Sequence, residues 1–175
     1  MKKKYLTILS LSAALALAAT CSVAQTGNGL DNPDWEEDQI PPPPSFSNDK
    51  LITLDMPAHV SVRISVDPAT IAVGSDGVVR YVIVMTNSTG NTNAVYEGIR
   101  CISDEVKTYA RQSAAGHWTI LANPVWKAVN DNMPSRHAQA FARQGGCQNR
   151  LATTKQEIIT ALTSGRKPGQ KNWTD

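Results

Sequence analysis

The chain lacks the short motifs that mark common catalytic and nucleotide-binding sites. Its 175 residues contain no HExxH, no CxxC, no Walker loop and no GxGxxG, so zinc-protease, thioredoxin-like and nucleotide-binding chemistry have no motif to support them. Ser75 lies in GSDG, which lacks the GxSxG pattern of a nucleophile elbow. The histidines His59, His117 and His137 are far apart and stand beside no carboxylate pair. We therefore predict no metal, no cofactor and no catalytic residue from local motifs.

Charge is scarce and nearly balanced. Charged residues make up 18% of the chain, with 17 Lys and Arg against 15 Asp and Glu. Three of these cations, Lys2, Lys3 and Lys4, lie at the very N-terminus, and without them the acidic residues are in slight excess. Because nucleic-acid binding needs a clustered basic face, we predict no nucleic-acid partner.

The first two dozen residues are typical of a signal peptide. The lysines precede a mostly apolar run at 5–19, and small residues at Ser22 and Ala24 fit a signal-peptidase site. The run is short for a bilayer span of about 20 residues, and no later segment is long and apolar enough to cross a membrane. We expect residues 1–24 to be removed by cleavage between Ala24 and Gln25.

This signal predicts a soluble protein in an exported compartment, either periplasmic or secreted. Acylation of Cys21 is the alternative that would anchor the protein to a membrane. If Cys21 leaves with the signal, Cys101 and Cys147 remain. An even pair in an oxidising compartment is more often a disulfide than a metal site. We therefore predict a bridge between Cys101 and Cys147, with a reactive thiol pair as the alternative.

The remaining chain divides into a linker, a globular domain and a tail. Residues 25–48 carry an acidic cluster and four consecutive prolines, a composition that favours an extended spacer. Trp35 is the exception in this spacer, because a lone aromatic either docks on its own domain or meets a partner. We predict a globular domain at 49–165 and a flexible tail at 166–175.

The globular part reads as strands followed by helices. Apolar alternation, β-branched runs and turn residues predict strands that form an antiparallel meander, at 59–66, 78–86, 92–101, 105–111 and 117–121. A helix capped by Ser135 is expected to end at Gly145, and a capping box from Thr154 to Glu157 opens a second helix. The order predicts an α+β fold, with C-terminal helices packed on a small antiparallel sheet.

Several motifs in this domain resemble those of the cryptic neisserial protein family, a group of exported bacterial proteins with no assigned activity. They are VGSDGVVRY at 73–81, YEGIRC at 96–101, NPVW at 123–126, Arg136-His137 and Cys147. The resemblance covers about 58–147 and implies a location in the envelope of a Gram-negative bacterium. It implies no catalytic residue, and the segment after Cys147 departs from the pattern.

The charged residues of the central hairpin are the main candidates for a site. If the loop at 87–91 keeps an even register, Arg80 and Glu97 share one face and form a cross-strand ion pair. A one-residue shift instead places Arg80 beside Tyr96 and Arg100. A functional interpretation makes these residues the floor of a binding groove, with aromatic and histidine walls. The candidate groove residues are Arg80, Tyr96, Glu97, Arg100, His117 and Trp118, with Trp126 as a further wall.

Two hypotheses follow for the function. The first is a non-catalytic binding or interaction module of the cell envelope, with a partner or ligand that the sequence does not identify. The alternative is a hydrolase that acts on envelope glycans or peptides, built around Glu97 with Arg80, Arg100 or His117. The alternative requires a concave site and a carboxylate with a raised pKa.

Overall fold

The structure is a computed structural model that describes residues 32–131 and 136–164. The predicted signal peptide, its cleavage site at Ala24 and Gln25, the alternative anchor Cys21 and the predicted tail all lie outside the described residues. No helix in the described ranges is long and apolar enough to cross a membrane.

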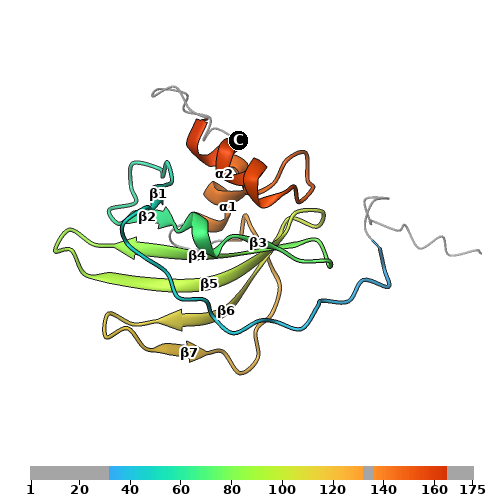
Figure 1. Cartoon of the computed structure of the whole chain (residues 1–175), viewed down its shortest axis with the longest axis horizontal. Coiled ribbons are helices and arrows are strands. Elements are labelled where there is room, and N and C mark those ends of the chain that lie inside the picture. The colour runs from blue at the N-terminus through green and yellow to red at the C-terminus, as the bar shows by residue number, and fades with distance from the viewer. Residues whose placement is uncertain (1–31, 132–135, 165–175) are drawn as a thin grey trace, which may run out of the picture.

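The centre of the fold is an antiparallel sheet, as predicted (Figure 1). Its strand order is β1-β2-β4-β5-β6-β7, while β3 pairs with β4 and β8 pairs with β6. The strands are β1 (Ile52–Thr53), β2 (Arg63–Val66), β3 (Ala72–Val73), β4 (Val78–Thr86), β5 (Thr92–Arg100), β6 (Glu105–Gln112), β7 (Trp118–Ile120) and β8 (Lys127–Ala128). Strands β4 and β5 are the longest, and their β-branched residues form the middle of the sheet.

The first predicted strand is shorter than its apolar alternation indicates. It begins at Arg63 rather than at His59, because the chain turns before it and Val60 donates a backbone hydrogen bond to Pro57. Val60 and Val62 nevertheless pack against the core. The apolar alternation therefore predicts which side chains face the core, but not the residue at which the hydrogen-bonded pairing of β2 begins.

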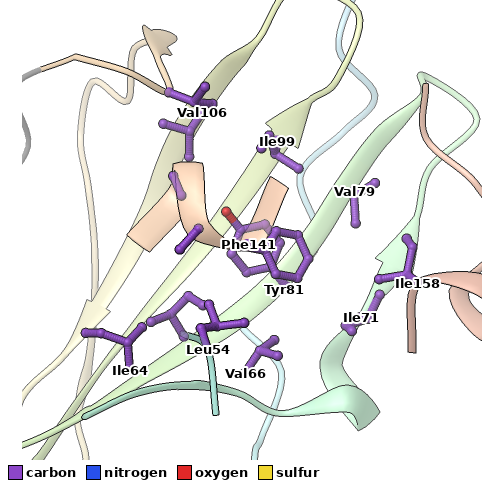
Figure 2. Close-up of a cluster of buried hydrophobic side chains, with 14 of the residues drawn as sticks. Leu54, Ile64, Val66, Ile71, Val79, Tyr81, Ile99, Val106, Phe141 and Ile158 are labelled. Atoms are coloured by element: carbon purple, nitrogen blue, oxygen red, sulfur yellow. The ribbon is translucent and has the colours of Figure 1, made fainter. Parts of the chain in front are cut away.

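One face of the sheet, called here the inner face, packs against the C-terminal helices. These are α1 (His137–Phe141), a π-helical turn (Ala142–Gly146) and α2 (Lys155–Ser164). Figure 2 shows Phe141 lying on Tyr81, with the two rings stacked at 3.9 Å between centroids. Ile158 of α2 completes the same apolar core. The α+β arrangement predicted from the order of elements is confirmed.

The ends of these helices follow local sequence signals only in part. The predicted capping box is present, because the Thr154 hydroxyl donates to Glu157 and the Glu157 amide donates back to Thr154. By contrast, α1 begins after Arg136, which adopts a left-handed φ of 49°, and the predicted cap Ser135 lies outside the described residues. The turn after α1 contains Gly145 at φ 139°, where a Cβ would collide with α2.

A disulfide ties the end of β5 to the segment that follows the π-helical turn. Cys101 and Cys147 are bonded in the structure, with 5.6 Å between their Cα atoms. Cys101 is buried, whereas Cys147 is half-buried. The bridge therefore fastens the helical layer to one end of the sheet.

The opposite face, called here the outer face, is covered by a segment without regular structure. Residues 32–51, named the strap, run along this face before the chain enters β1 (Figure 1). Ile40, Phe46 and Leu51 of the strap pack on a second apolar cluster that includes Val82 and Tyr96. The proline-rich stretch predicted as a spacer therefore lies against the sheet along its described length.

Candidate functional site

The register of the central hairpin separates Arg80 from Glu97. Thr86 pairs with Thr92 across the loop, so Arg80 lies opposite Gly98 and Tyr81 lies opposite Glu97. Because neighbouring residues of a strand point to opposite faces, Arg80 lies on the outer face and Glu97 on the inner face. The predicted ion pair between them is wrong. The alternative prediction, which puts Arg80 beside Tyr96 and Arg100, is the observed arrangement.

Glu97 is buried beneath helix α1 and is held by three side chains. Its Oε2 lies 2.9 Å from Nε2 of His137, and its Oε1 accepts a hydrogen bond of 2.9 Å from the Thr108 hydroxyl. The Tyr81 hydroxyl donates a longer bond of 3.5 Å to Oε2. Only 1% of Glu97 is exposed. This carboxylate therefore belongs to the interior and not to an open groove.

The environment of this pair favours the charged form of both partners. Burial alone would raise the pKa of Glu97, but the charge and hydrogen bond of His137 outweigh it, so this pKa is lowered. Burial alone would lower the pKa of His137, but Glu97 raises it. A general acid needs a raised carboxyl pKa and access to substrate. Glu97 has neither property.

Arg80 forms a separate ion pair with Asp76 on the outer face. Its Nη1 and Nη2 donate to the two carboxylate oxygens of Asp76 at 3.1 and 2.6 Å. Burial would raise the pKa of Asp76, but the hydrogen bond from Arg80 and two backbone amides lower it. This bidentate geometry holds Arg80 in place next to the strap.

Glu37 anchors the strap to that same region. Its two oxygens accept hydrogen bonds of 2.6 Å from Nζ of Lys107 and from the hydroxyl of Tyr109, and Arg80 lies 3.7 Å away. Burial and the bond to Glu37 raise the pKa of Tyr109, so this hydroxyl stays protonated. A Cβ at Gly98 would collide with that hydroxyl, which gives the glycine of the YEGIRC motif a packing role.

Trp35 is the second anchor of the strap. Its Nε1 donates to the backbone oxygen of Asp76 at 2.8 Å. The guanidinium of Arg100 lies 3.8 Å from the centre of the Trp35 ring, and Trp126 contacts it edge-on at 5.8 Å. The prediction that Trp35 docks on its own domain is confirmed. Arg100 and Trp126, expected in an open groove, instead hold the strap.

An open hollow remains at the other end of the strap. It has a volume of about 450 Å³ and lies between the strap, the start of β5 and the turn that joins β6 to β7. Trp118 lines it and contacts Phe46 edge-on at 6.2 Å. We call it the strap groove. His117 is exposed in the adjoining turn and does not line the hollow.

The structure therefore distributes the predicted groove residues over three places. Arg80, Tyr96 and Arg100 lie under the strap, Glu97 lies in the inner core, and Trp118 lines the strap groove with His117 nearby. No pattern in the sequence identified Glu37 and Asp76 as anchors or His137 as the partner of Glu97. The only signal for Glu37 was the acidic cluster around Trp35, which fits a solvated tether equally well, and Asp76 in GSDG fits an ordinary turn residue.

The titratable groups of the described residues form no metal centre. No group of three or more His, Cys, Asp or Glu in those ranges is placed to hold a metal ion. Glu97, Asp76 and Glu37 are engaged in the pairs described above. The strap groove is thus distinguished by aromatic and uncharged polar side chains.

Comparison with known proteins supplies the family but not an activity. No curated protein and no solved structure gives a significant match to the chain. A family model matches residues 30–163, which include the strap and both C-terminal helices. The match extends past Cys147, so the expectation that the chain departs from the family pattern there is wrong through residue 163. With most of its length matched, the chain belongs to the CNP1-like family.

Proposed function

We propose that this protein is a non-catalytic binding module of the cell envelope, exported to the periplasm or secreted by a Gram-negative bacterium. The signal-like N-terminus and the Cys101–Cys147 disulfide support this location, because disulfides persist in oxidising compartments. The fold supplies a rigid sheet, and its outer face carries a groove suited to a ligand.

The observation that carries the non-catalytic proposal is the burial of Glu97. The hydrolase alternative depends on this carboxylate, which is 1% exposed and paired with His137. An acid or base must lie within hydrogen-bond reach of the substrate. Helix α1 and the sheet enclose Glu97, so the alternative lacks its main catalytic candidate.

Sedimentation with isolated envelope material distinguishes the two functions. The full chain, expressed with its own N-terminal segment, is mixed with envelope fragments, and both the bound protein and the released soluble sugar and peptide are measured. We expect the protein to sediment with the fragments without releasing products. Steady product release that Glu97→Gln abolishes would establish the hydrolase instead. A chain that stays in the supernatant would contradict the binding proposal.

Location requires a separate measurement. Mass spectrometry of the protein from fractionated cells is expected to show Gln25 as the first residue. Glu36→Gln changes an exposed position of the strap and serves as a control for how much protein is recovered from the cell fractions. A lipid-modified Cys21 at the N-terminus would replace the soluble location with a membrane-anchored one. Recovery of the unprocessed chain from the cytoplasm would overturn the export proposal.

A further inference from the structure

The strap groove combines two aromatic rings with a row of uncharged polar side chains. Phe46 comes from the strap and Trp118 from β7, and both are half-buried. The polar side chains that line the hollow are Ser45, Asn48, Thr92, Gln112 and Ser113. No charged residue lines it. The lining therefore offers stacking surfaces and hydrogen bonds without an electrostatic preference for either sign.

The hydrogen-bonding capacity of this lining is free for a ligand. Within the described part of the chain, no hydrogen bond joins any of these five polar side chains to another residue. Asn and Gln amides each supply two donors and an acceptor, and each hydroxyl supplies a donor and acceptor sites. A ligand rich in neutral hydroxyls could bond the donors and the acceptors of this lining at once, because each hydroxyl both donates and accepts.

The aromatic pair adds a flat apolar surface to the same hollow. Phe46 and Trp118 meet edge-on at an angle of 74°, so the two rings present surfaces in different directions. Phe, Tyr and Trp side chains contribute large contact areas at low conformational cost. A pyranose ring has one or two faces made of C–H groups and an equatorial rim of hydroxyls. This distribution of C–H groups and hydroxyls on the sugar matches the groove, in which the rings of Phe46 and Trp118 are flanked by side-chain amides and hydroxyls.

We propose that the strap groove binds a neutral saccharide. This inference rests on the proposed binding function and names the ligand class of that site. The aromatic rings stack on the C–H faces of the sugar, while Gln112, Asn48 and the neighbouring hydroxyls bond its hydroxyl groups. The volume of about 450 Å³ lies within the usual range for small-ligand sites.

Two other hollows among the described residues have a different lining. A hollow of about 160 Å³ beside β6 is lined by Arg111 and Lys127, and one of about 330 Å³ near the disulfide is lined by Asp104 and Arg143. Both are lined in part by charged side chains. The strap groove differs from them in the chemistry of its lining, and that difference supports an uncharged ligand.

The test uses the full chain and four defined probes. Three are neutral trisaccharides, namely tri-N-acetylchitotriose, maltotriose and cellotriose, and the fourth is a penta-proline peptide. Calorimetry measures affinity, and NMR amide shifts locate the binding site. We expect at least one trisaccharide to bind with a Kd of about 1 mM or below, with shifts at Thr92, Gln112 and Trp118. Binding of penta-proline alone would replace the saccharide with a proline-rich peptide.

Matched variants separate the groove from the rest of the surface. Trp118→Ala is expected to raise the Kd about tenfold, and Gln112→Ala about fivefold. Ile120→Ala serves as the control, because Ile120 lies on the same strand, is 62% exposed and does not line the groove. If Trp118→Ala impairs folding, Gln112→Ala and the amide shifts still locate the site.

The outcomes distinguish this inference from the broader function. Absence of binding by all three trisaccharides, or binding that neither groove variant weakens, would overturn the saccharide site. If the chain still sedimented with envelope fragments, the binding function would stand with another ligand. If sedimentation also failed, both proposals would fall together.

Discussion

The two faces of the sheet are covered in different ways. The inner face lies under helices and a disulfide, and the pair of Glu97 and His137 is buried in its core. The outer face lies under an irregular strap that is anchored at one end through Trp35 and Glu37. At its other end the strap leaves an open groove beside Trp118.

The two kinds of cover leave different parts of the sheet accessible to a ligand. Regular elements satisfy their own backbone groups and can bury a large continuous apolar surface. The strap instead depends on a few side-chain anchors, so its cover is local and incomplete. We infer that the inner face sets global stability, while the outer face provides the surface available to a ligand.

Removal of the disulfide is expected to have the largest effect on the inner face. Cys101→Ser with Cys147→Ser opens a link with a sequence separation of 46, for which chain entropy predicts a loss of about 4 kcal/mol in the free energy of unfolding. Urea unfolding under oxidising conditions measures it. Added reductant should destabilise the wild type and leave the double variant unaffected. An unchanged midpoint in the variant would show that the bridge does not stabilise the helical layer.

His137→Ala should come next, with a loss of about 3 kcal/mol. The variant leaves the buried carboxylate of Glu97 without its main counter-charge. Denaturant unfolding at neutral pH measures the effect. The double variant Glu97→Gln with His137→Leu is the control, because it removes both charges and should recover part of the loss. Equal losses in the single and double variants would argue against a charged pair.

The same pair predicts a pH window for stability. The raised pKa of His137 adds stability that is complete below about pH 6.5 and is lost as pH rises through the folded-state value. The lowered pKa of Glu97 adds stability that is complete above about pH 4.5 and is lost as pH falls through the folded-state value. The free energy of unfolding of the wild type should therefore exceed that of the uncharged double variant by the largest amount between these two pH values. A difference independent of pH would contradict this account.

Glu37→Gln tests the outer face and should cost about 2 kcal/mol of strap docking. The change removes the charge that pairs with Lys107 and Arg80. Hydrogen exchange should show faster opening of the strap with little change in β4 and β5. Glu36→Gln is the matched control, since Glu36 is exposed. If Glu37→Gln lowered global stability as much as His137→Ala, the distinction between the two faces would fail.

Thr154→Ala should have the smallest effect, about 1 kcal/mol. The hydroxyl of Thr154 caps the first turn of α2, where it accepts from the amide of Glu157. Circular dichroism during thermal unfolding measures the loss. Gln156→Ala is the control in the same turn, because Gln156 is exposed and takes no part in the cap. Equal shifts in both variants would show that helix propensity, and not capping, causes the effect.

Local patterns in the sequence were sufficient for most of the fold. The β-branched run of β4, the turn at 87–91 and the capping box at Thr154 each depend on neighbours a few residues away. Such signals predict elements and their order well. They predicted the meander and the C-terminal helices, whereas the pairing of Cys101 with Cys147 followed from the number of cysteines and the expected compartment.

The candidate site depends on contacts that local patterns do not encode. The face of Arg80 changes with a single residue of register in the hairpin. Glu97 meets His137 across 40 residues of sequence, and Glu37 meets Lys107 across 70. The packing of the layers determines which of these residues meet. A polar tether and a docked strap can have the same composition, so composition alone does not distinguish them. The sequence therefore suggested the residues but not their grouping.

The bulge in the pairing of β5 with β6 has a consequence for the ligand. The register shifts between Tyr96 and Glu97, so that Gln112 pairs with Ala94 and Arg111 pairs with Val95. This shift places Gln112 on the outer side and Arg111 on the inner side. If the pairing ran on from Thr108 without this bulge, Arg111 would lie opposite Ala94 on the outer side, and a guanidinium would replace the amide at that position. The uncharged lining of the groove therefore depends on the bulge, which turns Gln112 and not Arg111 toward the outer side.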